Sequence, residues 1–562
     1  MPEEHSTKVE LATSPFFVRV VSSSHRLRSL ANAISVRLSQ YVTETGKTFS
    51  PYAMAAKTVF AFVLTLVLLT VFVIPLAVLV HPMLLALLVL PIFILISPWL
   101  IVRMWIGDRR RAVEEELPFF SIHAAILQAA GRDIYSALCS LIGRNVFPQI
   151  ERDAAIMQRN TTYFRMGPIE GIEELGRTTP NPKMSSLLLG YTSEWRAGGD
   201  AKRYLEQKTN ELLKEAEDRW EKYTGSVTYV GEMIISVMFL VPLLLLTSVF
   251  LSPDAGSSIA YAFLIIVFPI FCTVSIALIR SIQPKSYDVI DGSAVLGIVF
   301  AAICGAAAIY MNLPVWAMVV STLFGLFLGY GLPVLFQLRE ISAHERAITA
   351  FLRDVTEYQK MGYDIVRATI KISSENRYNF YFDRLLSRIA WQLSLGHRFS
   401  EVKFSTRSWL TRAAFFHLSE IAESGAYETI SLELLTDFIG NVSRMKRKAK
   451  SSLTIHRVLA MVTPLFLAVV VGVLTGLMQQ FFISPSITGL VVPSIMPQVS
   501  PYLVSLCHAV IIVSAIGVSL MSTYAHSFTM KNTAWVAINA ALAGVGILIS
   551  QPIASLIPAI AV

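Results

Sequence analysis

Few residue patterns in this chain could support catalysis. The nearest approach to a phosphate-binding loop is Gly46-Lys47-Thr48, but the Walker pattern needs a glycine five positions before Gly46, where Tyr41 stands instead. The ten histidines form no HExxH or HxxxH pattern, and no GxSxG nucleophile elbow occurs. We therefore expect no catalytic residue, no cofactor and no metal site, and a protein that is not an enzyme.

The four cysteines do not suggest a disulfide framework either. Cys139, Cys272, Cys304 and Cys507 show no CxxC spacing, and two or three of them lie in long apolar stretches. We interpret them as small apolar packing residues.

Ionisable residues inside the apolar stretches are scarce. The candidates are Lys57, Glu232 and Arg457, each within about a turn of one end of its stretch, where the side chain can reach water. Pumps and ion-coupled transporters need ionisable groups near the bilayer midplane. The pattern therefore disfavours a transporter.

The elements that carry these residues are mostly membrane-length. Mean hydropathy is +0.57 and 54% of the residues are hydrophobic, far above a soluble domain. Stretches of about 20 apolar residues can cross a hydrocarbon core of roughly 30 Å. Nine such spans are predicted: 56–80, 83–102, 229–251, 258–279, 293–311, 314–336, 458–482, 503–521 and 534–557.

Lys and Arg occupy only alternate loops between these spans. The loops near 81, 252–257, 312–313 and 482–502 contain none. By the positive-inside rule, the N-terminus is predicted in the cytoplasm and the C-terminus outside the cell, in a multi-pass cytoplasmic-membrane protein. This bias accounts for most of the net charge of +8, so we expect no nucleic-acid partner.

The predicted organisation is an all-α polytopic membrane protein with two cytoplasmic helical-bundle domains. Five to seven short helices are expected in each, with their first and last helices continuous with spans. The boundaries are a cytoplasmic N-terminal segment 1–55, spans 56–102, a first domain 103–228, spans 229–279 and 293–336, a second domain 337–457, spans 458–521 and a last span 534–557. Within the first segment, 16–41 is expected to be amphipathic.

The two domains share local sequence, which favours an internal duplication. Gly131-Arg-Asp-Ile-Tyr135 and Gly362-Tyr-Asp-Ile-Val366 are offset by 231 residues, each after an apolar helical pattern. Further on, Ser193-Glu-Trp-Arg-Ala-Gly-Gly199 is similar to Ser419-Glu-Ile-Ala-Glu-Ser-Gly425. Gly131 and Gly362 stand where a helix needs a left-handed residue after its end. Gly131, Gly199, Gly362 and Gly425 are therefore predicted as structural positions.

Charge clusters where the domains join the spans have two interpretations. They could anchor to anionic headgroups at about 1 kcal/mol per cation, or they could dock a cytoplasmic partner. The candidate docking residues are Arg109, Arg110, Arg111, Glu114, Glu115, Glu194, Glu420, Glu423, Arg444, Lys446, Arg447 and Lys448.

The repeated steps resemble the type II secretion system F domain family. The family's Gly-x-[Ser/Pro]-[Leu/Ile]-x-x-Ala-Leu step is similar to Gly131-Arg-Asp-Ile-Tyr-Ser-Ala-Leu138 and to Gly362-Tyr-Asp-Ile-Val-Arg-Ala-Thr369. Its Gly-Glu-x-x-Gly step is similar to the Ser-Glu segments, more closely in the second copy, where Glu423 precedes Gly425 by two residues. Nine spans resemble the archaeal members, which form the membrane platform of archaellum and archaeal type IV pilus machines.

This resemblance implies a non-enzymatic pilus assembly platform for protein secretion or filament growth. Such a platform docks a hexameric secretion ATPase, passes its motion to pilin subunits, contacts membrane lipids and is expected to be a homodimer. Small residues would suit transient contacts with pilin helices. The candidates for those contacts are Gly297, Gly305, Gly325 and Gly329.

Two other functions remain open from the residues alone. One is a duplicated-fold membrane transporter or permease, whose parallel halves transporters do sometimes show. The other is a membrane scaffold for a different cytoplasmic complex. The residues do not distinguish an adhesive pilus from an archaellum.

Overall fold

The computed structural model describes residues 16–41, 50–73, 90–251, 259, 263–375, 377–424, 429–483 and 501–560. Every regular element in these ranges is a helix, as the sequence predicts. The chain divides into two compact units, which are described separately. The first unit is Met1–Leu117 with Leu141–Gly199, and the second is Pro118–Ser140 with Asp200–Val562.

The first unit begins with a small helical cluster. Its elements are α2 (Phe16–Ser23), α3 (His25–Ser39), α5 (Pro51–Leu68) and the π-helical turn η1 (Leu69–Val73). The Ser50 side chain accepts a hydrogen bond from Ala53 N and so caps α5. Val21 and Ala31 pack against Ala56 on α5, and all three are fully buried. The predicted amphipathic segment is thus two helices packed on the first apolar helix.

The remaining helices of the first unit include most of the predicted first domain. They are the first part of α7 (Leu90–Ala129), α9 (Pro148–Phe164), α10 (Pro168–Thr178) and α11 (Pro182–Arg196). Three of them begin at a proline, which lacks the N–H that a first-turn residue would leave unpaired. Asn181 caps α11 by accepting from Lys183 N and Met184 N, and its amide donates to Arg110 O. Local sequence therefore sets where these helices begin.

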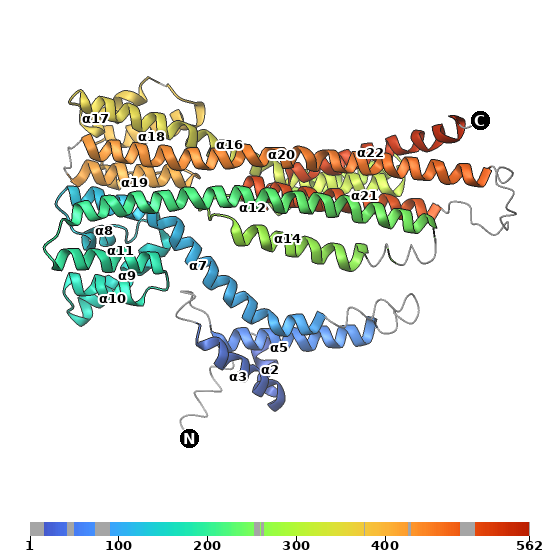
Figure 1. Ribbon diagram of the computed structural model, residues 1–562, viewed down its shortest axis with the longest axis horizontal. Coiled ribbons are helices and arrows are strands. Elements are labelled where there is room, and N and C mark those ends of the chain that lie inside the picture. The colour runs from blue at the N-terminus through green and yellow to red at the C-terminus, as the bar shows by residue number, and fades with distance from the viewer. Residues whose placement is uncertain are drawn as a thin grey trace. The chain divides into compact units, whose positions relative to one another are not determined.

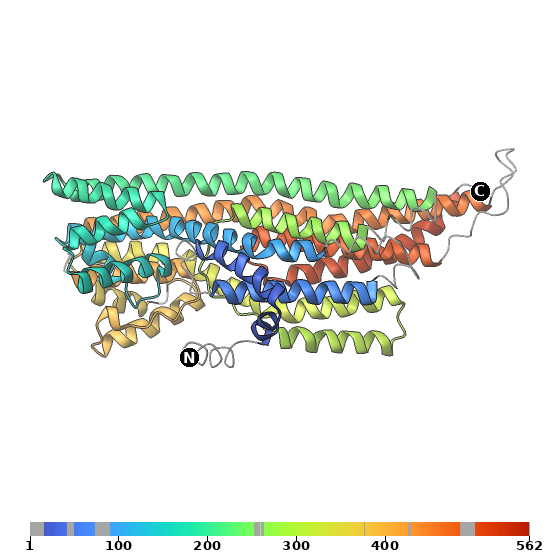
Figure 2. The same ribbon diagram turned by 90° about the horizontal axis from the view of Figure 1, so that it is seen from below.

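Among its described residues, the second unit contains five long helices (Figures 1 and 2). They are α12 (Ala201–Leu251), α16 (Val315–Lys360), α20 (Thr429–Ile483), α21 (Pro501–Ser527) and α22 (Ala534–Ile560). Shorter apolar elements are η3 (Phe263–Val267), α14 (Phe268–Ile282) and α15 (Ala294–Tyr310). Helix α20 packs against α12, α21 and α22, around a core that includes Leu467, Ile511 and Ile547.

Six helices among the described residues are long and apolar enough to cross a membrane, against nine predicted spans. They lie in Pro51–Val71, Ala201–Leu245, Val315–Lys360, Ile430–Leu477, Val504–Ser527 and Ala534–Ser555. The predicted spans 258–279 and 293–311 correspond to the shorter helices α14 and α15, of 15 and 17 residues. The predicted span 83–102 lies partly outside the described residues, and α7 begins at Leu90.

Close helix packing explains the glycines of α16. A Cβ on Gly325 would lie 2.5 Å from Phe300 O, and one on Gly329 would lie 2.6 Å from Leu296 O. Gly297 on α15 likewise faces Leu326 O at 3.1 Å. These small residues let α15 and α16 pack backbone to backbone within the chain. They are therefore not free to contact pilin helices, contrary to the sequence interpretation.

The second helical domain has an aromatic core. Its short helices are α17 (Ile365–Ser373), α18 (Phe380–Ser394), the 3-10 turn η4 (Phe399–Glu401) and α19 (Trp409–Ser424). Phe351 at the end of α16 packs against Phe382 and Phe415 with ring centroids 5.7 and 5.5 Å apart. All three rings are fully buried. The continuous helices α16 and α20 join this core to the apolar segments.

A helical hairpin from the predicted first domain belongs to the second unit. It consists of the end of α7 from Pro118 and of α8 (Ile134–Ser140). Phe119 packs against Trp409 and Phe438, with centroids 4.7 and 5.0 Å apart. The residues predicted as one compact bundle, 103–228, are thus divided between the two units.

The repeated Gly-x-Asp-Ile segments have the same backbone conformation. Helix α7 ends at Ala129 and α16 at Lys360, while α8 begins at Ile134 and α17 at Ile365, so both pairs are 231 residues apart. Gly131 has φ +81° and Gly362 has φ +88°, the left-handed conformation that glycine adopts at little cost.

Candidate functional site

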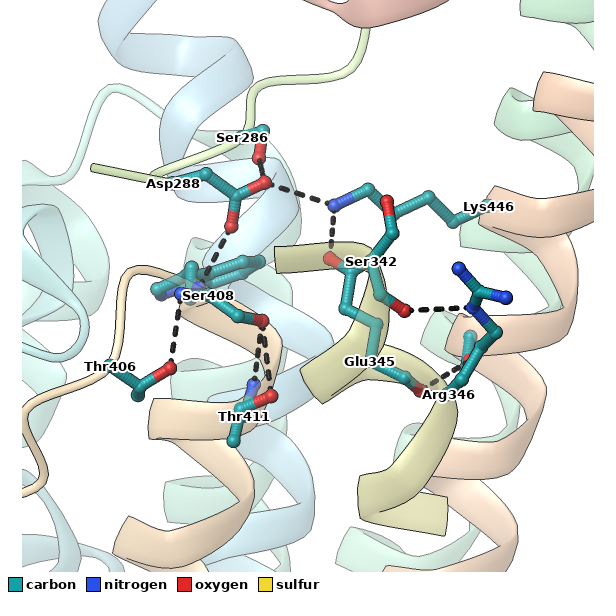
Figure 3. A network of polar contacts seen from close by, with 11 residues as sticks. Ser286, Asp288, Ser342, Glu345, Arg346, Thr406, Ser408, Thr411 and Lys446 are labelled. Carbon is teal, nitrogen blue, oxygen red and sulfur yellow. Dashed lines mark hydrogen bonds and ion pairs between the residues drawn. The ribbon is translucent and has the colours of Figure 1, made fainter. Parts of the chain in front are cut away.

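A buried ionic cluster ties the loop between α14 and α15 to the second helical domain (Figure 3). Lys446 Nζ on α20 lies 3.0 Å from Asp288 Oδ2 in that loop and 2.5 Å from Glu345 Oε1 on α16. The side chains of all three are 10–11% exposed. Asp288 also accepts from Ser286 Oγ and from Trp409 N.

The electrostatics of Asp288 favour the ionised carboxylate. Burial alone would raise the pKa of Asp288, but the Lys446 ammonium and the hydrogen bonds from Ser286 and Trp409 outweigh it and lower the pKa. Trp409 is the first residue of α19, so the carboxylate lies at a helix N-terminus, where negative charge is favoured. The cluster therefore holds the loop, α16, α19 and α20 together.

Further polar contacts, partly exposed, join the same loop to Arg407 and Gln337. Arg407 Nη1 lies 3.1 Å from Asp291 Oδ2 and donates to Gln337 Oε1, while Val289 N donates to Arg407 O. Gln337 also donates to Asp291 O, and its own oxygen accepts from Asp291 N. The α14–α15 loop is thus bonded to the domain along most of its second half.

On another side of α20, a groove of about 660 Å³ lies between α12 and α20. Apolar lining comes from Leu213, Trp220 and Met445, and cations come from Arg444 and Lys448. The Lys448 ammonium pairs with the carboxylate of Glu221 at 2.7 Å, with both side chains more than half exposed. Apolar lining with charged rims suits a protein segment better than a small metabolite.

Candidate metal ligands are scattered through the described ranges. Within them, no three His, Cys, Asp or Glu side chains are grouped so that they could hold a metal ion. Helices α12 and α20, which line the groove, continue into apolar segments.

Predicted docking residues near the start of the first domain are largely engaged with their own unit. Arg109 Nη2 lies 3.0 Å from Asp153 Oδ1, with both side chains at most 10% exposed. Arg111 pairs with Asp108 at 2.9 Å. Arg110 remains more than half exposed beside Glu114 at 3.6 Å, and Glu115 is half-buried.

The carboxylates of the two Ser-Glu segments lie in different surroundings. Glu194 at the end of α11 is exposed, whereas Glu420 in α19 is 7% exposed and so is removed from any docking surface. Glu423 is exposed but accepts a hydrogen bond from Ser400 N, at η4. The left-handed glycine after α11 is Gly198 rather than Gly199, and Gly425 lies outside the described residues.

The basic cluster of α20 separates into buried and exposed members. Arg444, Arg447 and Lys448 are exposed, and two of them line the groove. Lys446 is 8% exposed and paired with two carboxylates, so it cannot contact a partner as predicted. Helix geometry explains the split, because Lys446 and Lys448 are about 200° apart around α20.

Sequence reasoning missed the acids that matter most here. Asp288 and Glu345 lie 158 and 101 residues from Lys446, and no spacing pattern links them. Glu116, in the same acidic run as Glu114, is fully buried and accepts from Gln149 N and Ile150 N at the start of α9. Glu345 stands next to Arg346, and Glu116 follows Glu114 and Glu115, so nothing in the local sequence marks these acids as the buried ones.

Comparisons with known proteins found no match. No protein-family model matches the chain, and no curated protein and no solved structure is similar to it.

Proposed function

We propose that this protein is the integral-membrane platform of an archaeal type IV pilus-like assembly machine, either of an adhesive pilus or of an archaellum. In this proposal it docks a cytoplasmic hexameric secretion ATPase and passes the motor's motion to pilin subunits. The residue patterns that resemble the type II secretion system F domain family suggest this role. One structural observation carries it furthest, and that is the continuity of the long helices.

Helices α12, α16 and α20 each join a polar helical region to an apolar membrane-length segment without a break. Helix α20 alone has 55 residues, roughly 80 Å at about 1.5 Å per residue. A continuous helix transmits a displacement along its axis, whereas a flexible linker does not. Movement imposed on the polar ends would therefore reach the apolar segments directly.

The proposal includes a duplicated unit with nine spans. The equal spacing of helix ends and the paired left-handed glycines support two copies of one helical domain. The short apolar helices α14 and α15 and the apolar start of α7 would complete nine spans. A span count of nine would put the N-terminus in the cytoplasm and the C-terminus outside.

Cysteine labelling tests this topology. In a variant whose four native cysteines are serine, Met311→Cys introduces a thiol in the exposed α15–α16 turn. We expect an impermeant maleimide to label it in intact cells, and to label Lys403→Cys in the second domain only after lysis. The reverse pattern would invert the proposed orientation.

The motor-docking role makes the exposed cations of α20 and the groove beside them the proposed contact surface. Arg444, Arg447 and Lys448 changed together to Glu should abolish capture of a hexameric secretion ATPase by the full-length protein, measured by pull-down from detergent. Lys446 is left intact because its loss would disturb the buried cluster. A matched control changes three exposed cations elsewhere in the second domain, Arg353, Arg367 and Lys403, to Glu.

The outcome separates docking from headgroup anchoring. Loss of capture with normal membrane insertion in the groove variant, but not in the control, supports the motor role. Normal capture and normal filaments in a normally inserted groove variant would remove this surface from the proposal. Failure of the unaltered protein to bind the ATPase at all would overturn the platform function itself.

A further inference from the structure

A second, smaller pocket of about 130 Å³ lies where four segments of the second unit meet. The α14–α15 loop contributes Asp288, α16 contributes Leu338 and Ile341, and α20 contributes Lys446 and Lys450. The turn between α21 and α22 completes it with residues 527–529 and Lys531. Three lysines thus converge on a pocket that the groove and the docking surface do not include.

The ammonium groups of this pocket have hydrogen-bonding capacity left over. Each ammonium has three N–H donors. Lys446 directs two of them to Asp288 and Glu345, and Lys531 directs one to Ile290 O at 2.5 Å. No carboxylate of the described residues lies within ion-pair distance of Lys450, whose ammonium lies 5.9 Å from the ring centre of Phe528. Lys450 is half-buried, and Asp288 and Glu345 act on it only beyond ion-pair distance, so its charge is less fully balanced than that of Lys446.

Two hydroxyl groups in the turn can also donate into the pocket. Ser527 Oγ accepts a hydrogen bond from Asn532 Nδ2 at 2.8 Å, and Thr529 Oγ1 accepts from Lys531 N at 3.2 Å. Because each oxygen is used as an acceptor, each O–H remains available as a donor. Ser527 is 8% exposed, so its hydroxyl belongs to a formed site rather than to a mobile surface.

The net charge of the groups at this pocket indicates an anionic ligand. Three lysines face two carboxylates, Asp288 and Glu345, which leaves one positive charge in excess. Asp288 is the only acid that lines the pocket among the described residues, and its oxygens already accept from Lys446, Ser286 and Trp409. Lysine ammoniums together with hydroxyl donors are typical ligands of phosphate oxygens.

We propose that this pocket binds a phosphate group, which Lys450, Lys531, Ser527 and Thr529 hold and to which Lys446 gives its third N–H. The group belongs either to a membrane phospholipid or to free inorganic phosphate. Basic pockets between membrane helices bind lipid headgroups on the cytoplasmic side, which is the side proposed for this turn. The bound phosphate would join the α14–α15 loop to α20 and to the α21–α22 turn. This site is independent of motor docking.

The test uses purified full-length protein and measures binding in two arms. The first arm titrates inorganic phosphate in a phosphate-free detergent at constant ionic strength, with chloride as the reference, and follows the thermal unfolding midpoint. The second arm compares nanodiscs of phosphatidylglycerol with nanodiscs of a phosphate-free glycosyl diacylglycerol and counts retained lipid by native mass spectrometry. Stabilisation in the first arm alone assigns the site to inorganic phosphate, and retained phospholipid assigns it to headgroups.

Matched variants show whether the pocket is responsible. In whichever arm shows binding, the variant Lys450→Gln with Lys531→Gln should lower the affinity at least tenfold, and Lys450→Arg should retain it. Arg339→Gln removes an exposed cation of α16 next to Leu338 but outside the pocket, and should leave binding within twofold. Absence of phosphate and phospholipid effects in the unaltered protein, or equal losses in the pocket variant and in Arg339→Gln, would overturn the proposal. A normal gel-filtration profile and unliganded midpoint identify variants that are folded.

Discussion

Each of the two predicted helical domains contains a buried cation paired with carboxylate, yet the two arrangements differ in design. In the first domain one guanidinium, Arg109, serves one carboxylate, Asp153. In the second, one ammonium, Lys446, serves Asp288 and Glu345. The second pair reaches outside its own helical domain, because Asp288 comes from the loop that connects two apolar helices. The first pair joins α7 to α9 within its own domain.

This difference also appears in the direction in which the pKa of each carboxylate is shifted. Burial raises the pKa of Asp153 more than Arg109 lowers it, whereas the Lys446 ammonium and neighbouring donors lower the pKa of Asp288 against the effect of burial. Stability from Asp288 is present above its unfolded pKa of 3.8 and is lost as the pH falls through the lower folded value. Asp153 has the opposite sign, since its folded state binds the proton more tightly. A fall in pH therefore reduces the stability that Asp288 contributes in the second domain, and it lowers the cost of burying Asp153 in the first.

The largest predicted effect follows from removing each cation. Lys446→Met removes the cation that lies within ion-pair distance of both buried carboxylates and should cost about 3–5 kcal/mol of local stability. Arg109→Met leaves only Asp153, which can take up a proton, and should cost about 1–3 kcal/mol. Hydrogen exchange of the first turn of α19 and of α9, respectively, measures the two losses.

A compensating variant checks the cause of that loss. Lys446→Met combined with Asp288→Asn and Glu345→Gln should recover most of the protection, because no carboxylate of the cluster is then left without its ion-pair partner. If Lys446→Met and Arg109→Met weakened exchange protection equally, the contrast between the two pairs would be wrong.

The next effect concerns the helical hairpin 118–140, which was predicted in the first domain but belongs to the second unit. His123 in this hairpin lies 5.5 Å from His417 of α19 between ring centroids, and both are fully buried. Burial lowers the pKa of His123 from 6.5 to about 3 and that of His417 well below 6.5. Both rings are therefore packed in the neutral form.

The pH dependence of this contact has a definite sign. Because the folded state binds these protons less tightly than the unfolded state, the stability is complete above pH 6.5 and is lost as the pH falls toward 3. At pH 5 the loss for His123 should be about 2 kcal/mol. Exchange rates of residues 118–140, corrected for intrinsic chemistry, measure it. His123→Leu with His417→Leu should remove the dependence, and a wild-type slope in that variant would assign it to other groups.

Sequence alone could predict what depends on local patterns. Apolar length gave most of the long helices, and the Gly-x-Asp-Ile steps gave the ends of α7 and α16, because a left-handed residue after a helix is a local requirement. The segment 16–41, predicted to be amphipathic, forms two helices, and α12, α16 and α20 continue into apolar segments, as expected for helices that join the predicted domains to spans.

Contacts between distant segments were beyond reach for a physical reason. The burial of Lys446 depends on Asp288, 158 residues away, and that of Glu420 depends on the packing of α19, while the similar Glu194 is exposed. Side chains of the same type in similar local sequence are therefore buried in one domain and exposed in the other. Only the tertiary arrangement decides which of these side chains is buried. It also decides that the hairpin 118–140 belongs to the second unit.

The smallest predicted effect concerns Gly131 and Gly362, where a substitution should cost the two domains the same stability. Gly131 and Gly362 share a left-handed backbone, and an added Cβ at either meets no atom within 4 Å. Gly131→Ala and Gly362→Ala should therefore each cost about 1 kcal/mol through backbone conformation alone. Exchange protection of the last turns of α7 and α16 measures the two values.

A glycine inside a helix provides the control with opposite sign. Gly107 lies within α7, and an added Cβ there also meets no atom within 4 Å, so Gly107→Ala should stabilise by about 0.5–1 kcal/mol. Equal losses at Gly131 and Gly362, with a gain at Gly107, would mean that the copies retain one backbone design beneath their different ion pairs. A loss at only one of the two glycines would instead mean that the shared segment is held by packing particular to that domain, and the case for duplication would lose its structural support.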